Sequence, residues 1–212
     1  KAPNPWKKSL NLYQEKTAGT KDAFTGNYNP GYAKYIPLSI TTGKTLEETG
    51  LYSGFDLHLI TQRDITQTKS RTITNYWLLS IYPENFIVIN PIDAKRYGLK
   101  DGDKVQIISP SNKDGVWDLK NGTKKPMIGK VKITETIKPG VITFTLGHGH
   151  YATGASDQII DGKLIKGDAK RATGIHANAA MLVDPYLKNT CLIDPVGGSA
   201  VFYDTKVTLK KV

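Results

Sequence analysis

The chain has 212 residues, of which 39% are hydrophobic, 23% charged and 9% aromatic, which is enough apolar material for one domain with a sizeable core. Its formal net charge of +10 favours anionic partners such as phosphorylated cofactors, nucleic acid or an acidic protein surface. A single cysteine excludes an internal disulfide and a thiolate metal cluster, and no apolar run reaches the roughly 20 residues that cross a bilayer.

Residues 1–54 are rich in Tyr, Gly, Asn, Pro and Thr and show no sustained apolar period, with a strong turn signal at residues 28–32. Residues 1–6 lack the apolar segment of a signal peptide. We interpret residues 1–54 as an extended arm whose aromatic side chains cover either the rest of the chain or a neighbouring domain. Residues 55–212 are expected to form one β-rich domain.

Residues 55–61 alternate apolar and polar side chains, which predicts a strand that delivers Thr61 and Arg63-Asp64 at its end. The polar residues that follow, up to Thr74, suit a binding loop better than a core element. In such a loop a guanidinium binds phosphate through two hydrogen bonds, and a carboxylate accepts from the N–H groups of guanine or pterin. An ordinary surface ion pair at a strand end is the alternative.

Residues 87–108 predict a strand, a short helix, a turn and a second strand. Asn90 is expected to cap the helix, Pro91 has the φ required at its first position, and Gly98 is expected to end it with Leu99 folding back on Ala94. An Asp-Gly turn at residues 101–102 then leads into the second strand.

The rest of the chain continues the β pattern. Residues 110–126 predict a loop or a short exposed hairpin, followed by strands at residues 128–134 and 141–146, a short helix at residues 178–183 and a last strand at residues 200–209. Lys130 and Lys132 alternate with apolar residues, which is typical of the solvent face of a strand. Cys191 precedes two aliphatic residues and is expected in the core.

A glycine-rich segment follows the strand at residues 141–146. On an extended backbone His148 and His150 would point the same way and could supply two metal ligands, but partner ligands are lacking, so a hydrogen-bonding role is favoured. The glycines at 147, 149 and 154 would let the backbone press against a flat or phosphorylated ligand. The chain also lacks a G-x-S-x-G elbow and a Walker or Rossmann fingerprint.

Residues 89–94 (Ile-Asn-Pro-Ile-Asp-Ala), Gly98-Leu99 and residues 101–105 resemble the signature of the molydopterin-dinucleotide-binding domain, the last domain of the dimethyl sulfoxide reductase family. Residues 138–141, Asp194-Pro195 and Gly197-Gly198 fall in the order of that family. Residues 12–15 and 26–37 are similar to the segment before this domain in tetrathionate and respiratory arsenate reductases, and residues 147–154 favour the tetrathionate group. The resemblance implies a mainly β fold, a six-stranded double-psi β-barrel with short helices.

The resemblance also implies which side chains contact the pterin and the guanosine. They would lie in the polar loop that follows the strand at residues 55–61 and runs to Thr74 (the first loop), and in the glycine-rich segment at residues 147–154 (the glycine loop). Others would lie near residue 178 and on the last strand. Two departures from the family pattern weaken this mapping: Gln67 stands where many relatives have His, and the insertion at residues 110–126 is long. The implied cofactor-binding residues are Thr61, Arg63, Asp64, Gln67, Arg71, His148, Gly149, His150, Asn178, Phe202 and Tyr203.

The function implied is to hold molybdopterin guanine dinucleotide in a respiratory oxidoreductase of the tetrathionate, arsenate or polysulfide reductase type. The molybdenum or tungsten ligand and any catalytic residue would lie elsewhere in the enzyme. Partners implied are an iron–sulfur electron-transfer subunit, together with the remaining N-terminal domains of the same subunit, with no nucleic acid and no membrane insertion. The family often works on the outer face of the cytoplasmic membrane. The alternatives are a basic nucleic-acid-binding barrel and a separate double-psi barrel subunit.

Overall fold

The computed structural model describes residues 18–212 apart from 23, 24, 33, 34, 36, 70, 121, 153 and 194–197. The similarities noted at residues 12–15, at Asp194-Pro195 and at Gly197 therefore lie outside the described residues, as do residues 1–6. The chain divides into two compact units. Unit 1 comprises Lys1–Leu51 with Val183–Val201, and unit 2 comprises Tyr52–Leu182 with Phe202–Val212.

A buried carboxylate ties together the two stretches of unit 1. Asp184 accepts hydrogen bonds from the backbone N–H groups of Thr41 at 2.7 Å, Tyr186 at 2.8 Å and Leu187 at 3.0 Å. Burial acts to raise the pKa of Asp184, but these hydrogen bonds act more strongly and the net shift is downward. The ionised side chain therefore joins residues near 41 to residues near 186.

The expectation that Cys191 lies in the core is wrong, because its side chain is exposed. Cys191 pairs with Val183 in an isolated antiparallel bridge, and its neighbour Leu192 is buried. Successive side chains of an extended chain point to opposite faces. The inward position is thus taken by Leu192, and Cys191 points outward.

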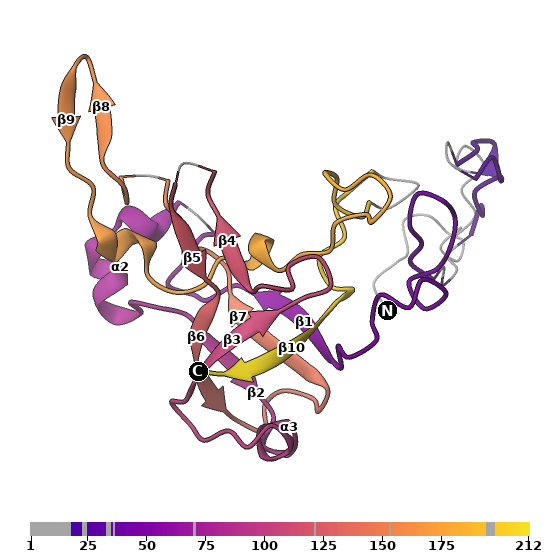
Figure 1. The fold of residues 1–212 in the computed structure, drawn as a ribbon, viewed down its shortest axis with the longest axis horizontal. Helices are drawn as coiled ribbons and strands as arrows, with labels where there is room; N and C mark the ends of the chain where they lie inside the picture. Colours follow the sequence, from indigo (N-terminus) through magenta and orange to yellow (C-terminus); the bar gives the residue numbers. More distant parts are fainter. Residues whose placement is uncertain are drawn as a thin grey trace, which may run out of the picture. The chain divides into compact units, whose positions relative to one another are not determined.

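Six strands of unit 2 close into a barrel in the order β1-β10-β3-β6-β2-β7, which confirms the predicted six-stranded double-psi barrel (Figure 1). The β1–β7 and β2–β6 pairs are parallel and the other four are antiparallel. Parallel pairs need a long connection between the two strands, and β1 and β7, like β2 and β6, are far apart in the sequence. The strands are β1 Leu57–Gln62, β2 Phe86–Ile89, β3 Lys104–Ile108, β6 Ile128–Ile133, β7 Val141–Thr145 and β10 Thr205–Lys211.

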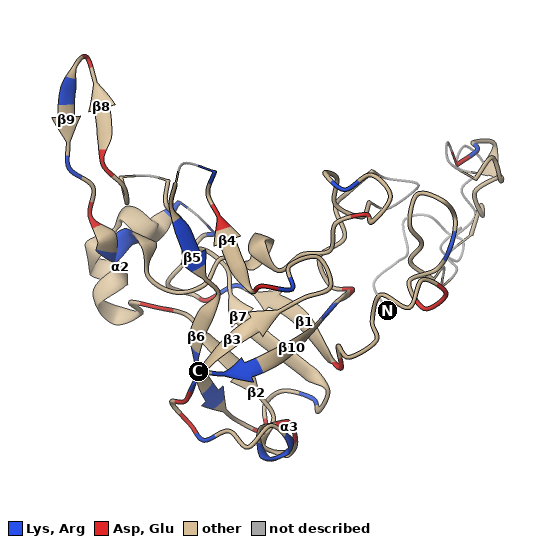
Figure 2. Ribbon diagram, viewed as in Figure 1, with Lys and Arg blue, Asp and Glu red and all other residues tan. Residues whose placement is uncertain are grey.

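Alternating side chains fill the barrel. Leu57, Leu59 and Phe144 are fully buried in one apolar cluster with residues from all six strands. The lysines take the outer positions: on β6, Lys132 is exposed and Lys130 partly exposed, while Val131 between them is buried. Lys and Arg are spread over many elements of the ribbon (Figure 2). The solvent-face interpretation of these two lysines is confirmed.

Helix α3, Pro91–Arg96, forms as its sequence predicts. Asn90 caps it by accepting a hydrogen bond from Ile92 N at 2.9 Å, and Pro91 occupies the first position. Gly98 adopts a φ of +63°, in the left-handed region that favours glycine, and Leu99 N donates to Ala94 O at 2.8 Å. Local chemistry alone is sufficient to specify this element.

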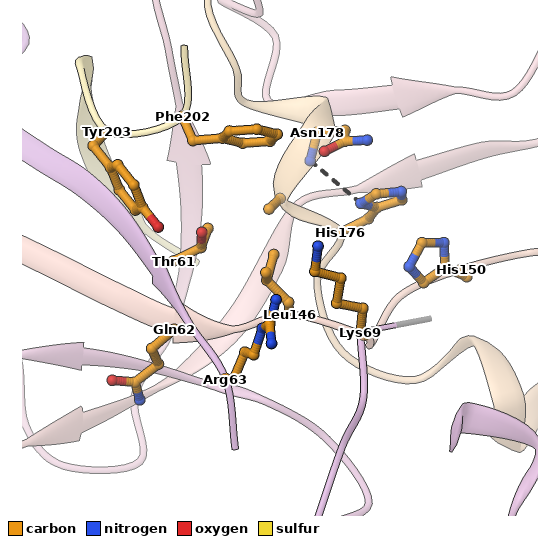
Figure 3. Close-up of a pocket in the computed structure, with 12 residues that line it drawn as sticks. Thr61, Gln62, Arg63, Lys69, Leu146, His150, His176, Asn178, Phe202 and Tyr203 are labelled. Carbon is orange, nitrogen blue, oxygen red and sulfur yellow. Dashed lines mark hydrogen bonds between the residues drawn. The ribbon is translucent and has the colours of Figure 1, made fainter. Parts of the chain in front are cut away.

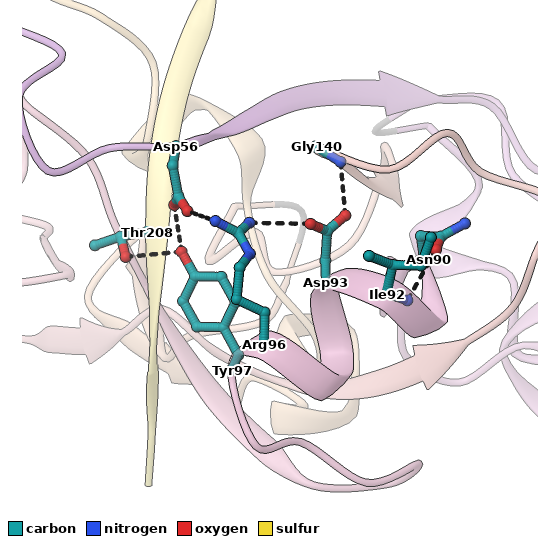
Figure 4. Close-up of polar contacts among 8 residues, drawn as sticks. All are labelled: Asp56, Asn90, Ile92, Asp93, Arg96, Tyr97, Gly140 and Thr208. Carbon is teal, nitrogen blue, oxygen red and sulfur yellow. Dashed lines mark hydrogen bonds and ion pairs between the residues drawn. The ribbon is translucent and has the colours of Figure 1, made fainter.

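A polar network fastens α3 to the start of β7 and to β10 (Figure 4). Asp93 accepts from Gly140 N at 2.6 Å and pairs with Arg96 at 2.9 Å. Arg96 and Tyr97 both contact the Asp56 carboxylate, and burial together with that hydrogen bond raises the pKa of Tyr97 to about 12. Since Gly140 immediately precedes β7, α3 marks the end of the barrel at which β7 begins.

The smaller elements lie in the segments that connect the barrel strands. They are η1 Thr72–Thr74, α2 Tyr76–Ile81, a hairpin of β4 Val116–Asp118 and β5 Lys124–Pro126, a hairpin of β8 Gln158–Ile160 and β9 Lys163–Ile165, η2 Ala169–Ala172 and η3 Ala177–Ala179. The β4–β5 hairpin confirms one form of the prediction for residues 110–126. No helix in the described part of the chain is long and apolar enough to span a membrane.

The prediction of a helix at residues 178–183 is wrong, because only the single 3-10 turn η3 forms there. Leu182 N donates to the hydroxyl of Thr205 at 3.3 Å, and Val183 enters a β-bridge. Backbone groups that a helix would use are therefore bonded elsewhere, and the chain extends. The last strand is also displaced, beginning at Thr205 rather than near residue 200.

Candidate functional site

Two parallel strands deliver the loops that build the site. β1 and β7 are neighbours with Thr61 opposite Phe144 and Gln62 opposite Thr145, and Leu146 N donates to Gln62 O at 2.9 Å. Both strands therefore end together, opposite the end that carries α3. β10 runs antiparallel to β1, so the residues before Thr205 lie beside the end of β1.

The glycine loop after β7 lies in close contact with two other segments. At Gly147 the φ is +103°, and a Cβ there would lie 2.9 Å from the Lys69 carbonyl carbon and closer still to its oxygen. At Gly149 the φ is +76°, and a Cβ would lie 2.5 Å from His176 N. Only glycine permits both approaches. The glycine loop therefore brings the backbone near Lys69 and the backbone near His176 close to each other.

Asn85, just before β2, anchors the segment around residue 176 through hydrogen bonds of its side chain. Its amide nitrogen donates to Thr145 O at 2.8 Å and to Ile175 O at 2.9 Å, while its oxygen accepts from Ile175 N at 2.8 Å. The side chain is buried and all of its hydrogen-bonding directions but one are used. Asn85 therefore fixes the segment before η3 against the end of β7.

These loops enclose a cavity of about 430 Å³ within unit 2. That volume falls within the ordinary range for ligand pockets, about 300–1,000 Å³. Figure 3 shows Phe202 and Tyr203 on one side, His150 and His176 on the other, and Arg63 and Lys69 between them. The lining residues are Thr61, Gln62, Arg63, Lys69, Leu146, Gly147, His150, His176, Ala177, Asn178, Phe202 and Tyr203.

The cavity is electrostatically one-sided, because its lining includes Arg63 and Lys69 but no acidic residue. Both cations come from the loop after β1, where Asp64 is turned into the loop itself. Hydrogen bonds from the Thr66 hydroxyl and backbone N–H to the Asp64 carboxylate lower its pKa. A bound anion would therefore meet two positive side chains.

Two imidazoles form one wall, and both are neutral at pH 7. The rings of His150 and His176 lie 4.0 Å apart between centroids, and Trp117 of β4 packs edge-on against His176 at 4.6 Å. Burial, His150 and Lys125 lower the pKa of His176 to about 4, and burial likewise lowers that of His150. Since Asn178 N donates to Nδ1 of His176 at 3.3 Å, the neutral ring carries its proton on Nε2.

We expect His176 to make the chain sensitive to acid. Its pKa is about 4 when folded and near 6.5 when unfolded, so between those values the unfolded chain binds a proton that the folded chain does not. Stability is therefore lost as the pH falls through this window, by up to about 3 kcal/mol from this group. Denaturant unfolding at a series of pH values should show a shallower loss for His176→Gln than for the wild type. Equal slopes, or an imidazole NMR titration of His176 near 6.5, would contradict this.

Six of the eleven residues predicted to bind the cofactor line this cavity: Thr61, Arg63, His150, Asn178, Phe202 and Tyr203. The other five lie outside its lining. Asp64 and Gln67 bond within the first loop, where the Gln67 oxygen accepts from the Thr72 hydroxyl at 2.6 Å. Arg71 is exposed at the start of η1, and Gly149 is buried. Ligand contact by each of the eleven remains a prediction.

His148 also lies outside the lining, and it does not point the same way as His150. Its ring is 0% exposed, packs edge-on against Tyr82 at 5.3 Å, and has Nε2 3.2 Å from Tyr82 O. The positive φ angles of Gly147 and Gly149 break the extended backbone on which the parallel arrangement depended. Among the described residues, no group of three or more His, Cys, Asp or Glu could hold a metal ion.

Sequence reasoning missed several residues at the cavity. Lys69, Gln62, Leu146 and Ala177 line it without any motif to mark them. No motif marks His176 either, and its two-residue spacing from Asn178 is the one available signal. Trp117 and Asn85 support the wall from outside the lining, and nothing in their local sequence indicates this.

Residues 57–116, which include β1, the first loop, α3 and β3, match the Molydopterin dinucleotide binding domain. This segment belongs to that family. The chain is 43% identical over 202 residues to a selenate reductase subunit from Mesobacillus selenatarsenatis, covering 95% of this chain and 19% of the relative. It is 29% identical over 200 residues to a tetrathionate reductase subunit from Salmonella typhimurium, covering 93% of this chain and 18% of the relative. The chain thus spans about a fifth of the length of these relatives.

A solved structure shares the fold of this chain. Acetylene hydratase from Pelobacter acetylenicus superposes with a TM-score of 0.57 over 87% of this chain and 22% of its own, at 16% identity, which shows a shared fold. The predicted resemblance to tetrathionate reductase is confirmed, and the identity to the selenate reductase subunit is higher. The cofactor of this family is molybdopterin guanine dinucleotide, as the sequence predicts.

The residues of the cavity fit such a ligand. Arg63 and Lys69 supply positive charge for phosphate oxygens, and the rings of Phe202 and Tyr203 offer flat surfaces for a heterocycle. Outside the lining, in the two loops that border the cavity, the Nε2 atom of Gln67 and the Nδ1 atom of His148 are buried without a hydrogen-bond partner among the described residues. Because a buried polar atom without a partner is unfavourable, each of these two atoms is able to form one further hydrogen bond. The cavity has room for part of an extended dinucleotide.

Proposed function

We propose that this chain is the part of a catalytic subunit that binds molybdopterin guanine dinucleotide in a respiratory molybdopterin oxidoreductase. The names of its relatives indicate that the substrate of the enzyme would be an oxyanion or a sulfur compound. The supporting observation is the cavity itself. Four segments far apart in sequence, near residues 63, 148, 177 and 202, converge there with cations, neutral imidazoles and aromatic rings.

Each kind of side chain has a distinct part in this proposal. Arg63 and Lys69 would bind the pyrophosphate, Arg63 through its planar guanidinium and Lys69 as a point charge. Phe202 and Tyr203 would pack against a ring, and His176 would donate from Nε2 to a ring nitrogen or carbonyl oxygen. When bound, the cofactor supplies redox chemistry at its metal, while these residues orient it, balance its charge and exclude water.

The remaining domains of the same subunit would supply the metal ligand, and a separate iron–sulfur subunit would carry electrons. We propose further that residues 1–54 pack on those other domains. The metal, molybdenum or tungsten, would be held outside this chain, because no group of three or more His, Cys, Asp or Glu side chains gathers among the described residues.

The test uses the full-length subunit purified with its cofactor. Arg63→Ala and Lys69→Ala should each weaken retention of the dinucleotide by roughly tenfold or more, because a hydrogen bond to a charged group contributes about 1.5–3 kcal/mol. Retention is measured as guanosine monophosphate released by acid hydrolysis and as metal content, each per subunit.

The matched control is Lys95→Ala. Lys95 is exposed on α3, at the opposite end of the barrel, so its replacement removes the same charge without touching the cavity. Retention should equal that of the wild type. Equal loss in Lys95→Ala and Arg63→Ala would mean that net charge matters rather than the cavity, and unchanged retention in both cavity variants would refute the assignment.

A further inference from the structure

The β8–β9 hairpin projects from unit 2 with all six of its strand residues exposed (Figure 1). Ile159 and Leu164 stand opposite each other on the two strands, at 76% and 56% exposure. A two-stranded hairpin is marginally stable at best in water by itself, and monomeric proteins rarely leave contiguous apolar groups uncovered. The hairpin therefore has the properties of a surface that is covered in the working protein.

Both faces of the hairpin carry aliphatic side chains. Because side chains alternate along each strand, Ile159 and Leu164 share one face, while Ile160 and Ile165 lie on the other. All four are exposed. A surface hairpin that served only as a connection would keep one face polar. Ile160 and Ile165 share their face with Lys163 and Gln158, so the wholly apolar face of Ile159 and Leu164 is the one that suits burial against an apolar wall.

The base and the tip of the hairpin are fixed. Asp157 pairs with Lys166 at 2.7 Å and accepts from Gly167 N at 2.9 Å, which clamps the strands where they leave the domain. At the tip, Asp161 and Gly162 have φ values of +49° and +75°, as in the tight Asp-Gly turns of hairpins. The element is thus built before any partner binds, which lowers the entropic cost of docking.

Helix α2, next to the base of the hairpin, carries exposed apolar side chains of its own. Asp168, three residues after β9, accepts from the Tyr76 hydroxyl at 2.7 Å, so the base of the hairpin lies against this helix. Trp77 and Ile81 are four residues apart on α2, share one side of it and are exposed. Hairpin and helix together present a larger apolar area than the hairpin alone.

We propose that the β8–β9 hairpin docks into an apolar cleft in the remainder of the same subunit. This inference rests on the proposed function. The alignment with the selenate reductase subunit covers 95% of this chain but 19% of that subunit, so about four fifths of a subunit of that kind lies outside these 212 residues. A surface in the same polypeptide is present at a high effective concentration, which favours it over a separate protein.

The experiment uses the full-length subunit expressed in its own host. A photo-crosslinking amino acid replaces Ile159 in one variant and Leu164 in a second, and it replaces Ile92 in a control. Ile92 is also exposed and apolar but lies on α3. After irradiation, mass spectrometry should find residues 159 and 164 joined to peptides outside the 212 residues, within one polypeptide, and Ile92 joined to none. Mixing isotopically labelled and unlabelled subunits separates intramolecular from intermolecular products.

Several outcomes would overturn the proposal. They are crosslinks to a second copy, to a different polypeptide or only within the 212 residues, and a yield no higher than that of the Ile92 control. The dinucleotide content of the same preparation, measured as released guanosine monophosphate, keeps the two proposals apart. Retained dinucleotide without the crosslinks refutes the docking alone, whereas the crosslinks without dinucleotide refute the proposed function alone.

Discussion

Replacing Gly147 with alanine is expected to destabilise the chain by about 3 kcal/mol or more. Its φ of +103° is strained for any residue with a Cβ atom, and the added methyl would overlap the Lys69 carbonyl. That carbonyl is backbone, so relief requires the first loop and the glycine loop to separate. Denaturant unfolding of the 212-residue chain measures the loss, and in the full-length subunit dinucleotide retention should fall in parallel.

Gly102→Ala is the matched control for this substitution. Gly102 also has a positive φ, +83°, but nothing lies within 4 Å of where its Cβ would be. Its replacement should cost only the backbone strain, about 1 kcal/mol. If Gly147→Ala were no more destabilising than Gly102→Ala, the close approach of the two loops would be wrong.

Asn85→Ala should also cost about 3 kcal/mol, because it leaves two buried carbonyls and one N–H without their side-chain partner. The groups affected are Thr145 O, Ile175 O and Ile175 N. We expect faster hydrogen exchange around residues 174–178 and weaker dinucleotide retention, since the segment that carries His176 and Asn178 loses its anchor. Asn85→Asp should be no better at neutral pH, because its carboxylate would face two carbonyl oxygens.

Asn75→Ala gives the corresponding comparison. Asn75 is exposed and caps α2 by accepting from Trp77 N at 3.0 Å, so its loss should cost about 1 kcal/mol and leave exchange at residues 174–178 unchanged. Similar exchange profiles for the Asn85 and Asn75 variants would show that Asn85 does not position the cavity wall.

The parts of the fold that sequence predicted are those specified by neighbouring residues. α3 follows from Asn90, Pro91 and Gly98, whose effects on the backbone are local. β6 follows from the alternation of lysine and aliphatic side chains over residues 130–133. Barrel closure joins β1 to β7 and β10, strands separated by some 80 to 150 residues in the chain. No local pattern specifies such pairings, and only the family resemblance implied them.

The same distinction between local and long-range information applies to the site. The loop after β1 and the glycine loop were predicted as binding segments because their composition is unusual for core elements. Which of their side chains reach the cavity depends on backbone turns: Gly147 and Gly149 send His148 inward to Tyr82 and His150 outward to His176. Lys69 reaches the lining because Gly147 packs on its backbone.

An experimental structure of the full-length subunit with its cofactor bound tests the cavity assignment most directly. We predict a dinucleotide phosphate within about 4 Å of the Arg63 or Lys69 side chain. A ring of the same ligand should lie between the Phe202–Tyr203 side and the His150–His176 side. A structure in which the dinucleotide binds elsewhere, while the cavity between these residues holds only water, would contradict it.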